Sequence, residues 1–88
     1  MNYEYDSYMR DGASWERTAS NRASNGDYLG ARDAYFNAAD CYSSAASIAW
    51  EAGDTWASNS ANREAEAARR AASDMVYEYD RKVKEYTM

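Results

Sequence analysis

Proline is absent from this chain, and a glycine followed by an aspartate occurs at only two places, Gly26-Asp27 and Gly53-Asp54. Alanine, glutamate and arginine, which favour helices, are abundant, whereas β-branched residues are too few to build a sheet. Glycine suits the left-handed residue that ends a helix, and aspartate suits the cap that begins the next one. The sequence therefore predicts an all-α fold with three helices, at about 2–25, 27–52 and 54–86.

The apolar positions of the second predicted helix indicate how the three helices pack. They recur every three or four residues and cover most of its circumference, as in Tyr28, Ala31, Tyr35, Ala38 and Tyr42. We therefore expect a three-helix antiparallel bundle in which this helix is central. The chain length predicts a single domain, residues 1–88. The first helix is less regular, and Asp11-Gly12 predicts a kink there or a split into helices at 2–11 and 13–25.

Seven residues between positions 12 and 38 follow a spacing that we recognise: Trp15, Ala19, Gly26, Tyr28, Ala31, Tyr35 and Ala38. This spacing resembles a single tetratricopeptide repeat. The chain departs from that pattern at Thr18, Arg22 and Ser43, where the family has a leucine, an aromatic residue and a proline. The resemblance implies an antiparallel helical hairpin in which Trp15 and Ala19 face the second helix. It does not imply a peptide groove, because such grooves need three or more repeats.

The residue types that catalysis or metal binding would need are mostly missing. The chain has no histidine and one cysteine, which argues against Ser-His and Cys-His pairs and against the usual zinc sites. No glycine-rich loop resembles a phosphate-binding motif. Acidic pairs such as Asp33 and Asp40 are typical of a solvated helix face, and Cys41 is typical of a small buried hydrophobe. We therefore expect no enzyme activity, no catalytic residue, no cofactor and no bound metal.

The charge pattern narrows the choice of partner and compartment. Fifteen acidic and ten basic residues give a net charge of −5, and the two signs are interspersed, which argues against direct binding to nucleic acid. No apolar run approaches the ~20 residues of a membrane span. The first residues lack the pattern of a signal peptide, and a single cysteine fits a reducing compartment. These features predict a cytoplasmic protein without a membrane partner.

Aromatic residues are the most informative feature for function. Nine tyrosines exceed what a small three-helix core can hold, although Tyr28, Tyr35 and Tyr42 suit that core. Tyrosine and tryptophan are frequent in protein-binding hot spots. The candidate partner-binding residues are those near the two termini and on the outer side of the second helix: Tyr3, Tyr5, Tyr8, Phe36, Trp50, Tyr77, Tyr79 and Tyr86.

These observations favour a small non-enzymatic protein-binding module that occupies a surface of a larger protein. By profile only, in its size, acidity and lack of enzyme motifs, the chain resembles the small inhibitors that phages and mobile elements encode against host defence, such as anti-CRISPR proteins. That resemblance implies an inhibitor of a defence complex in the host cell cytoplasm. Two alternatives stay open: a self-assembling structural protein that forms homo-oligomers, and a lone adaptor of the tetratricopeptide type.

Overall fold

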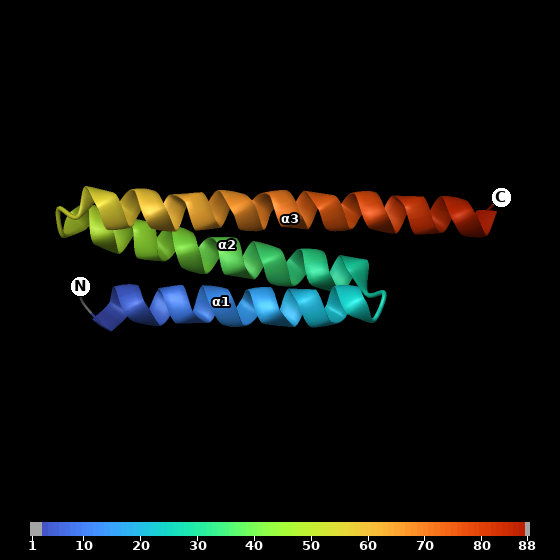
Figure 1. Cartoon of the computed structure of the whole chain (residues 1–88), viewed down its shortest axis with the longest axis horizontal. Helices are drawn as coiled ribbons and strands as arrows, with labels where there is room; N and C mark the ends of the chain where they lie inside the picture. Colours follow the sequence, from blue (N-terminus) through green and yellow to red (C-terminus); the bar gives the residue numbers. More distant parts are fainter. Residues whose placement is uncertain (1–2, 88) are drawn as a thin grey trace.

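The computed structural model describes residues 3–87, and each regular element within them is an α-helix. Helix α1 spans Tyr3–Ser24, α2 spans Tyr28–Glu51 and α3 spans Thr55–Thr87. Consecutive helices run antiparallel, and both α1 and α3 pack on α2, whereas they scarcely touch each other (Figure 1). The predicted all-α fold, the helix bounds to within one residue and the central position of α2 are confirmed.

The two Gly-Asp turns have the same geometry. Gly26 and Gly53 have φ angles of 81° and 80°, a left-handed conformation that side chains other than glycine rarely adopt. The Oδ1 atoms of Asp27 and Asp54 each accept a hydrogen bond from the backbone amide three residues later, at 2.9 and 3.0 Å. Each turn therefore ends one helix with its glycine and caps the next with its aspartate.

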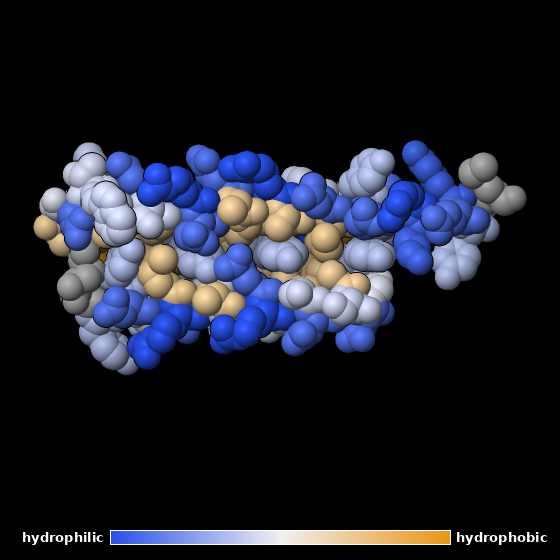
Figure 2. Space-filling model, in the orientation of Figure 1, coloured by the Kyte–Doolittle hydropathy of each residue, from blue (hydrophilic) through white to orange (hydrophobic). Residues whose placement is uncertain are grey.

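The core of the protein consists almost entirely of alanine. Among residues 3–87, every buried apolar side chain is an alanine except Tyr42. Small side chains let neighbouring helices approach to about 8 Å, the short end of the usual range. Met9 and Trp15 of α1 pack against a cluster with alanines from both α2 and α3, and hydrophobic atoms gather between α1 and α3 in Figure 2. Because a methyl group removes little area from water, each alanine contact contributes little hydrophobic free energy.

Gly12 lies inside α1, which continues through it without the predicted split. The ring of Tyr42 packs directly on this glycine, and a Cβ atom added there would lie 2.7 Å from the ring. The Tyr42 hydroxyl donates a hydrogen bond to Glu16 Oε1, which holds the ring across α1. Gly12 is therefore a packing position that makes room for the one large core side chain.

We expect Gly12→Ala to destabilise the protein although alanine favours helices. The better helix propensity is worth about 1 kcal/mol, whereas overpacking a fixed ring costs about 1–3 kcal/mol. Urea unfolding should show a net loss of about 1 kcal/mol. In a Tyr42→Leu background, which lacks the ring, the same substitution should cost nothing. An equal cost in both backgrounds would contradict this account of Gly12.

We also expect Tyr42 to make the protein sensitive to alkali. Burial, followed by the hydrogen bond to Glu16 and the nearby negative charges, raises the pKa of Tyr42 well above its usual value. The folded protein then holds this proton more tightly than the unfolded chain does, so the free energy of unfolding falls as pH rises above about 10. Tyr42→Phe should lower the free energy of unfolding by about 1 kcal/mol at neutral pH. Most of the decrease in that free energy at alkaline pH should disappear in this variant. Urea unfolding of both proteins across this pH range would check it.

Candidate interaction surface

Helix α3 is longer than the helix it packs against. It has 33 residues and α2 has 24. If residues are paired outward from the turn at Gly53, Tyr28 at the start of α2 lies level with Glu78 of α3, next to Tyr79. Residues 80–87 therefore project about 12 Å beyond the start of α2, as the free end of α3 in Figure 1 shows. We call residues 80–87 the C-terminal overhang.

The apolar stripe of α3 continues into this overhang. Its first members, from Ala61 to Ala72, are buried against the rest of the protein. The stripe then continues with the same spacing of three and four but with larger side chains that are exposed by 36, 39, 41 and 87%: Val76, Tyr79, Val83 and Tyr86. We call these four residues the α3 seam. The side chains on the stripe become large at the point where α3 loses its partner helix.

The base of the overhang forms a hollow with the first turn. This hollow has a volume of about 360 Å³ and lies between Tyr28 of α2, the turn residue Asn25 and the seam residues Tyr79, Val83 and Tyr86. It places three tyrosine rings around one open space. Such a space suits a side chain of a partner protein, because tyrosine offers both an apolar ring and a hydroxyl group.

The charge of the overhang differs from that of the whole chain. It contains three basic and two acidic residues, although the protein carries −5: Asp80, Arg81, Lys82, Lys84 and Glu85. Arg81 donates a hydrogen bond to Glu78 one turn earlier, which leaves Lys82 and Lys84 as the cations nearest the tip. Both are exposed. The overhang is therefore a locally basic, aromatic tip on an acidic protein.

The opposite end of the molecule, which we call the aromatic end, comprises residues 3–8 and 47–59. Tyr3, Trp50 and Trp56 are exposed there by 78, 67 and 76%. These two segments contain four acidic residues and no lysine or arginine. Burial, then the negative charges of Asp54 and Asp6, raise the pKa of the Tyr5 hydroxyl, because a negative phenolate is disfavoured beside carboxylates. The aromatic end is therefore acidic, in contrast to the overhang.

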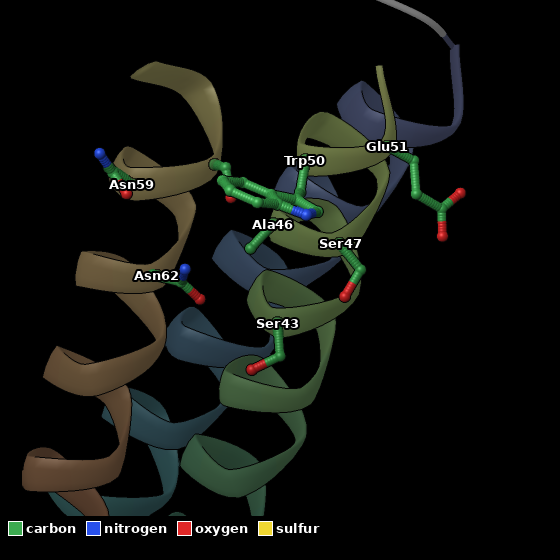
Figure 3. Close-up of a pocket in the computed structure, with 8 residues that line it drawn as sticks. Ser43, Ala46, Ser47, Trp50, Glu51, Asn59 and Asn62 are labelled. Atoms are coloured by element: carbon green, nitrogen blue, oxygen red, sulfur yellow. The ribbon is translucent and has the colours of Figure 1, made fainter. Parts of the chain in front are cut away.

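A groove of about 450 Å³ lies between α2 and α3 at the aromatic end. Figure 3 shows the Trp50 indole reaching from α2 towards α3, with Ser43 and Asn62 facing each other below it and Ala46 in between. Glu51 stands at the rim. We call this feature the Trp50 groove. It combines an aromatic wall with hydroxyl and amide groups and one carboxylate.

The structure separates the predicted partner-binding residues into two groups at opposite ends. Tyr3, Tyr5, Tyr8 and Trp50 lie towards the aromatic end, and Tyr77, Tyr79 and Tyr86 lie near or on the overhang. Tyr5 is half-buried because it packs on an alanine cluster.

Phe36 belongs to neither group, and its predicted part in partner binding stays a prediction. It is exposed by 46%, but fourteen residues of helix separate it from Trp50, about 21 Å. Trp56, Val76 and Val83 are also exposed, although they are not among the residues predicted to bind a partner. The unequal lengths of the second and third predicted helices were the available signal for Val83.

The other features considered as possible sites do not indicate a particular chemistry. Within residues 3–87 no group of three or more acidic, histidine or cysteine side chains could hold a metal ion. No helix in the same range is long and apolar enough to cross a membrane. Cys41 is half-buried, and burial together with Asp11 and Asp40 raises the pKa of its thiol. A raised pKa disfavours the reactive thiolate.

Comparison with known proteins finds no matching family model, no similar curated protein and no similar solved structure. The resemblances to a tetratricopeptide repeat and to small phage inhibitors therefore stay predictions.

We expect the overhang to be dispensable for folding. Residues 81–87 are all exposed, so a chain that ends at Asp80 loses few buried contacts. Its thermal unfolding midpoint should lie within a few degrees of that of the full chain, with circular dichroism showing helix loss only in proportion to length. A matched truncation at Ala71, which removes the buried Ala72 and the half-buried Met75, should lower the midpoint strongly. Collapse of the fold in both truncations would assign the overhang a structural role.

Proposed function

We propose that this chain is a non-enzymatic protein-binding module that presents the α3 seam, which continues onto the overhang, to a larger partner protein. The observation that supports the proposal is that small side chains lie in the core and large ones lie at the surface. Alanine fills the core, while ten large hydrophobic side chains are exposed within residues 3–87. Exposed aromatic side chains reduce solubility unless they bind something, and tyrosine and tryptophan contribute disproportionately to protein interfaces.

The form of the overhang suggests how such a partner is bound. An apolar stripe with helical spacing is the usual way in which one helix packs in a groove of another protein. The seam gives four side chains on one face, and the hollow at its base offers a place for one side chain of the partner. The basic residues beside the seam favour a partner whose groove is bordered by carboxylates. The overall charge of −5 makes nucleic acid an unfavourable partner.

The more specific prediction is that the chain is an inhibitor from a phage or mobile element that acts in the host cytoplasm. In that case the partner is a host defence complex. Occupying a functional surface of a host defence complex requires only a small rigid module and no catalytic group. The profile of the chain is compatible with this role, and the experiment below tests it together with the general proposal.

The proposal predicts that the seam controls capture of a partner. Tagged protein incubated with lysate of the cells that produce it, or of their phage-sensitive host, should retain one protein in near-stoichiometric amount. Val83→Ser with Tyr86→Ser should reduce that capture at least tenfold, because it removes the exposed apolar face. Tyr77→Ser, which changes an exposed tyrosine outside the seam, should leave capture unchanged.

The identity of the captured protein decides the finer prediction. A defence nuclease, inhibited on binding, would support the inhibitor role, and a metabolic or structural protein would contradict it. Capture that is insensitive to the seam substitutions would contradict the assignment of the overhang. Equal circular dichroism spectra of all three proteins would ensure that folding does not explain a loss.

A further inference from the structure

The two ends of this protein are complementary to each other. The overhang carries exposed Val83 and Tyr86, and the exposed cations Lys82 and Lys84 flank Val83. The aromatic end carries Trp50 over an open groove, with four carboxylates and no lysine or arginine in its two segments. A basic aromatic projection and an aromatic groove within an acidic end therefore occupy opposite ends of one rod whose Cα atoms extend over 54 Å. The groove lining itself contains one carboxylate, Glu51, and Arg69 reaches its Ser43 hydroxyl.

We propose that the Trp50 groove accepts the C-terminal overhang of a second copy of this chain, so that molecules join head to tail. This inference goes beyond the proposed function because it assigns a second surface and names its occupant. Its failure would leave the capture of another protein by the seam unaffected.

The chemistry of the groove matches the tip of the overhang. The Trp50 indole offers an apolar wall for the Tyr86 ring, and Asn59 and Asn62 offer amide groups for its hydroxyl (Figure 3). The Ser43 hydroxyl already accepts a hydrogen bond from Arg69, at 2.9 Å. Ala46 and the serines that line the groove are small, which lets a helix approach closely. Glu51 at the rim is placed to face Lys82 or Lys84 of the second copy.

Charge disfavours the simpler pairing of two overhangs. Each overhang contains three basic and two acidic residues, so two of them side by side would place like charges together. The aromatic end has the opposite charge, which favours the overhang of another copy at that position. Salt should weaken this association, because the charges involved are exposed.

The path of the chain permits this joint. Helix α3 begins at the aromatic end and ends in the overhang (Figure 1). An overhang can therefore lie in the groove of the next copy with both rods pointing in the same direction. Such a head-to-tail contact uses two different surfaces and leaves one of each free at the ends of the assembly. Further copies can add, so the contact produces chains of copies.

The test uses two variants, each defective at one surface. Lys82→Glu with Lys84→Glu alters the overhang, and Trp50→Ala with Glu51→Lys alters the groove. All four side chains are exposed, so circular dichroism should show unchanged helix content. The control is Trp56→Ala, which removes an equally exposed tryptophan that does not line the groove.

Sedimentation equilibrium should be measured at protein concentrations up to about 1 mM. A contact this small buries less area than the ~1,200 Å² of a usual stable interface, so its affinity is weak. We expect the average mass of the wild type and of Trp56→Ala to rise with concentration beyond a dimer. Each defective variant should stay monomeric. An equal mixture of the two variants should form a dimer and nothing larger, because it has one intact overhang and one intact groove per pair.

Three results would overturn the proposal. A wild type that is monomeric at every concentration shows that the ends do not bind each other. Self-association that persists in either variant places the contact elsewhere. A mixture that stays monomeric, although the wild type associates, shows that the contact is not between an overhang and a groove.

Discussion

The close packing of alanine on α2 determines where every other large side chain can lie. Because α1 and α3 both approach α2 through methyl groups, little volume is left between the helices for rings. Tyr42 enters the core only where Gly12 removes a side chain from the facing helix. The remaining aromatic residues lie partly or largely outside, at the ends of the helices and on their outer faces. The surface chemistry of the protein is therefore a consequence of how its core is packed.

Local signals in the sequence were sufficient for the fold. The two Gly-Asp pairs combine a helix-ending glycine with a helix-capping aspartate, and both steps depend only on neighbouring residues. The reason for Gly12 could not be predicted in the same way. Its neighbour is a ring thirty positions later, so the local pattern indicated a break where the tertiary structure has a contact.

The candidate surface was less predictable because it depends on the relative position of whole helices. Exposure of Tyr3, Tyr77 and Tyr86 followed from an excess of aromatic residues, but their separation into two ends did not. Phe36 and Trp50 share a helix and a side, yet the rise of the helix keeps them apart. Trp56 directly precedes buried Ala57, and one residue along a helix turns the side chain by about 100°. The side chain of Trp56 therefore points away from the core, which depends on the packing of α3 on α2.

The overhang is prepared for binding because it continues a helix that is already folded. A detached peptide of this length is largely unstructured in water, since starting a helix is costly. Within α3 the start of the helix is stabilised by the alanine contacts with α2, and each further residue extends it at little cost in free energy. A partner therefore meets Val83 and Tyr86 on a helix that has already formed. The binding free energy of these few side chains is then not offset by the cost of ordering a flexible segment.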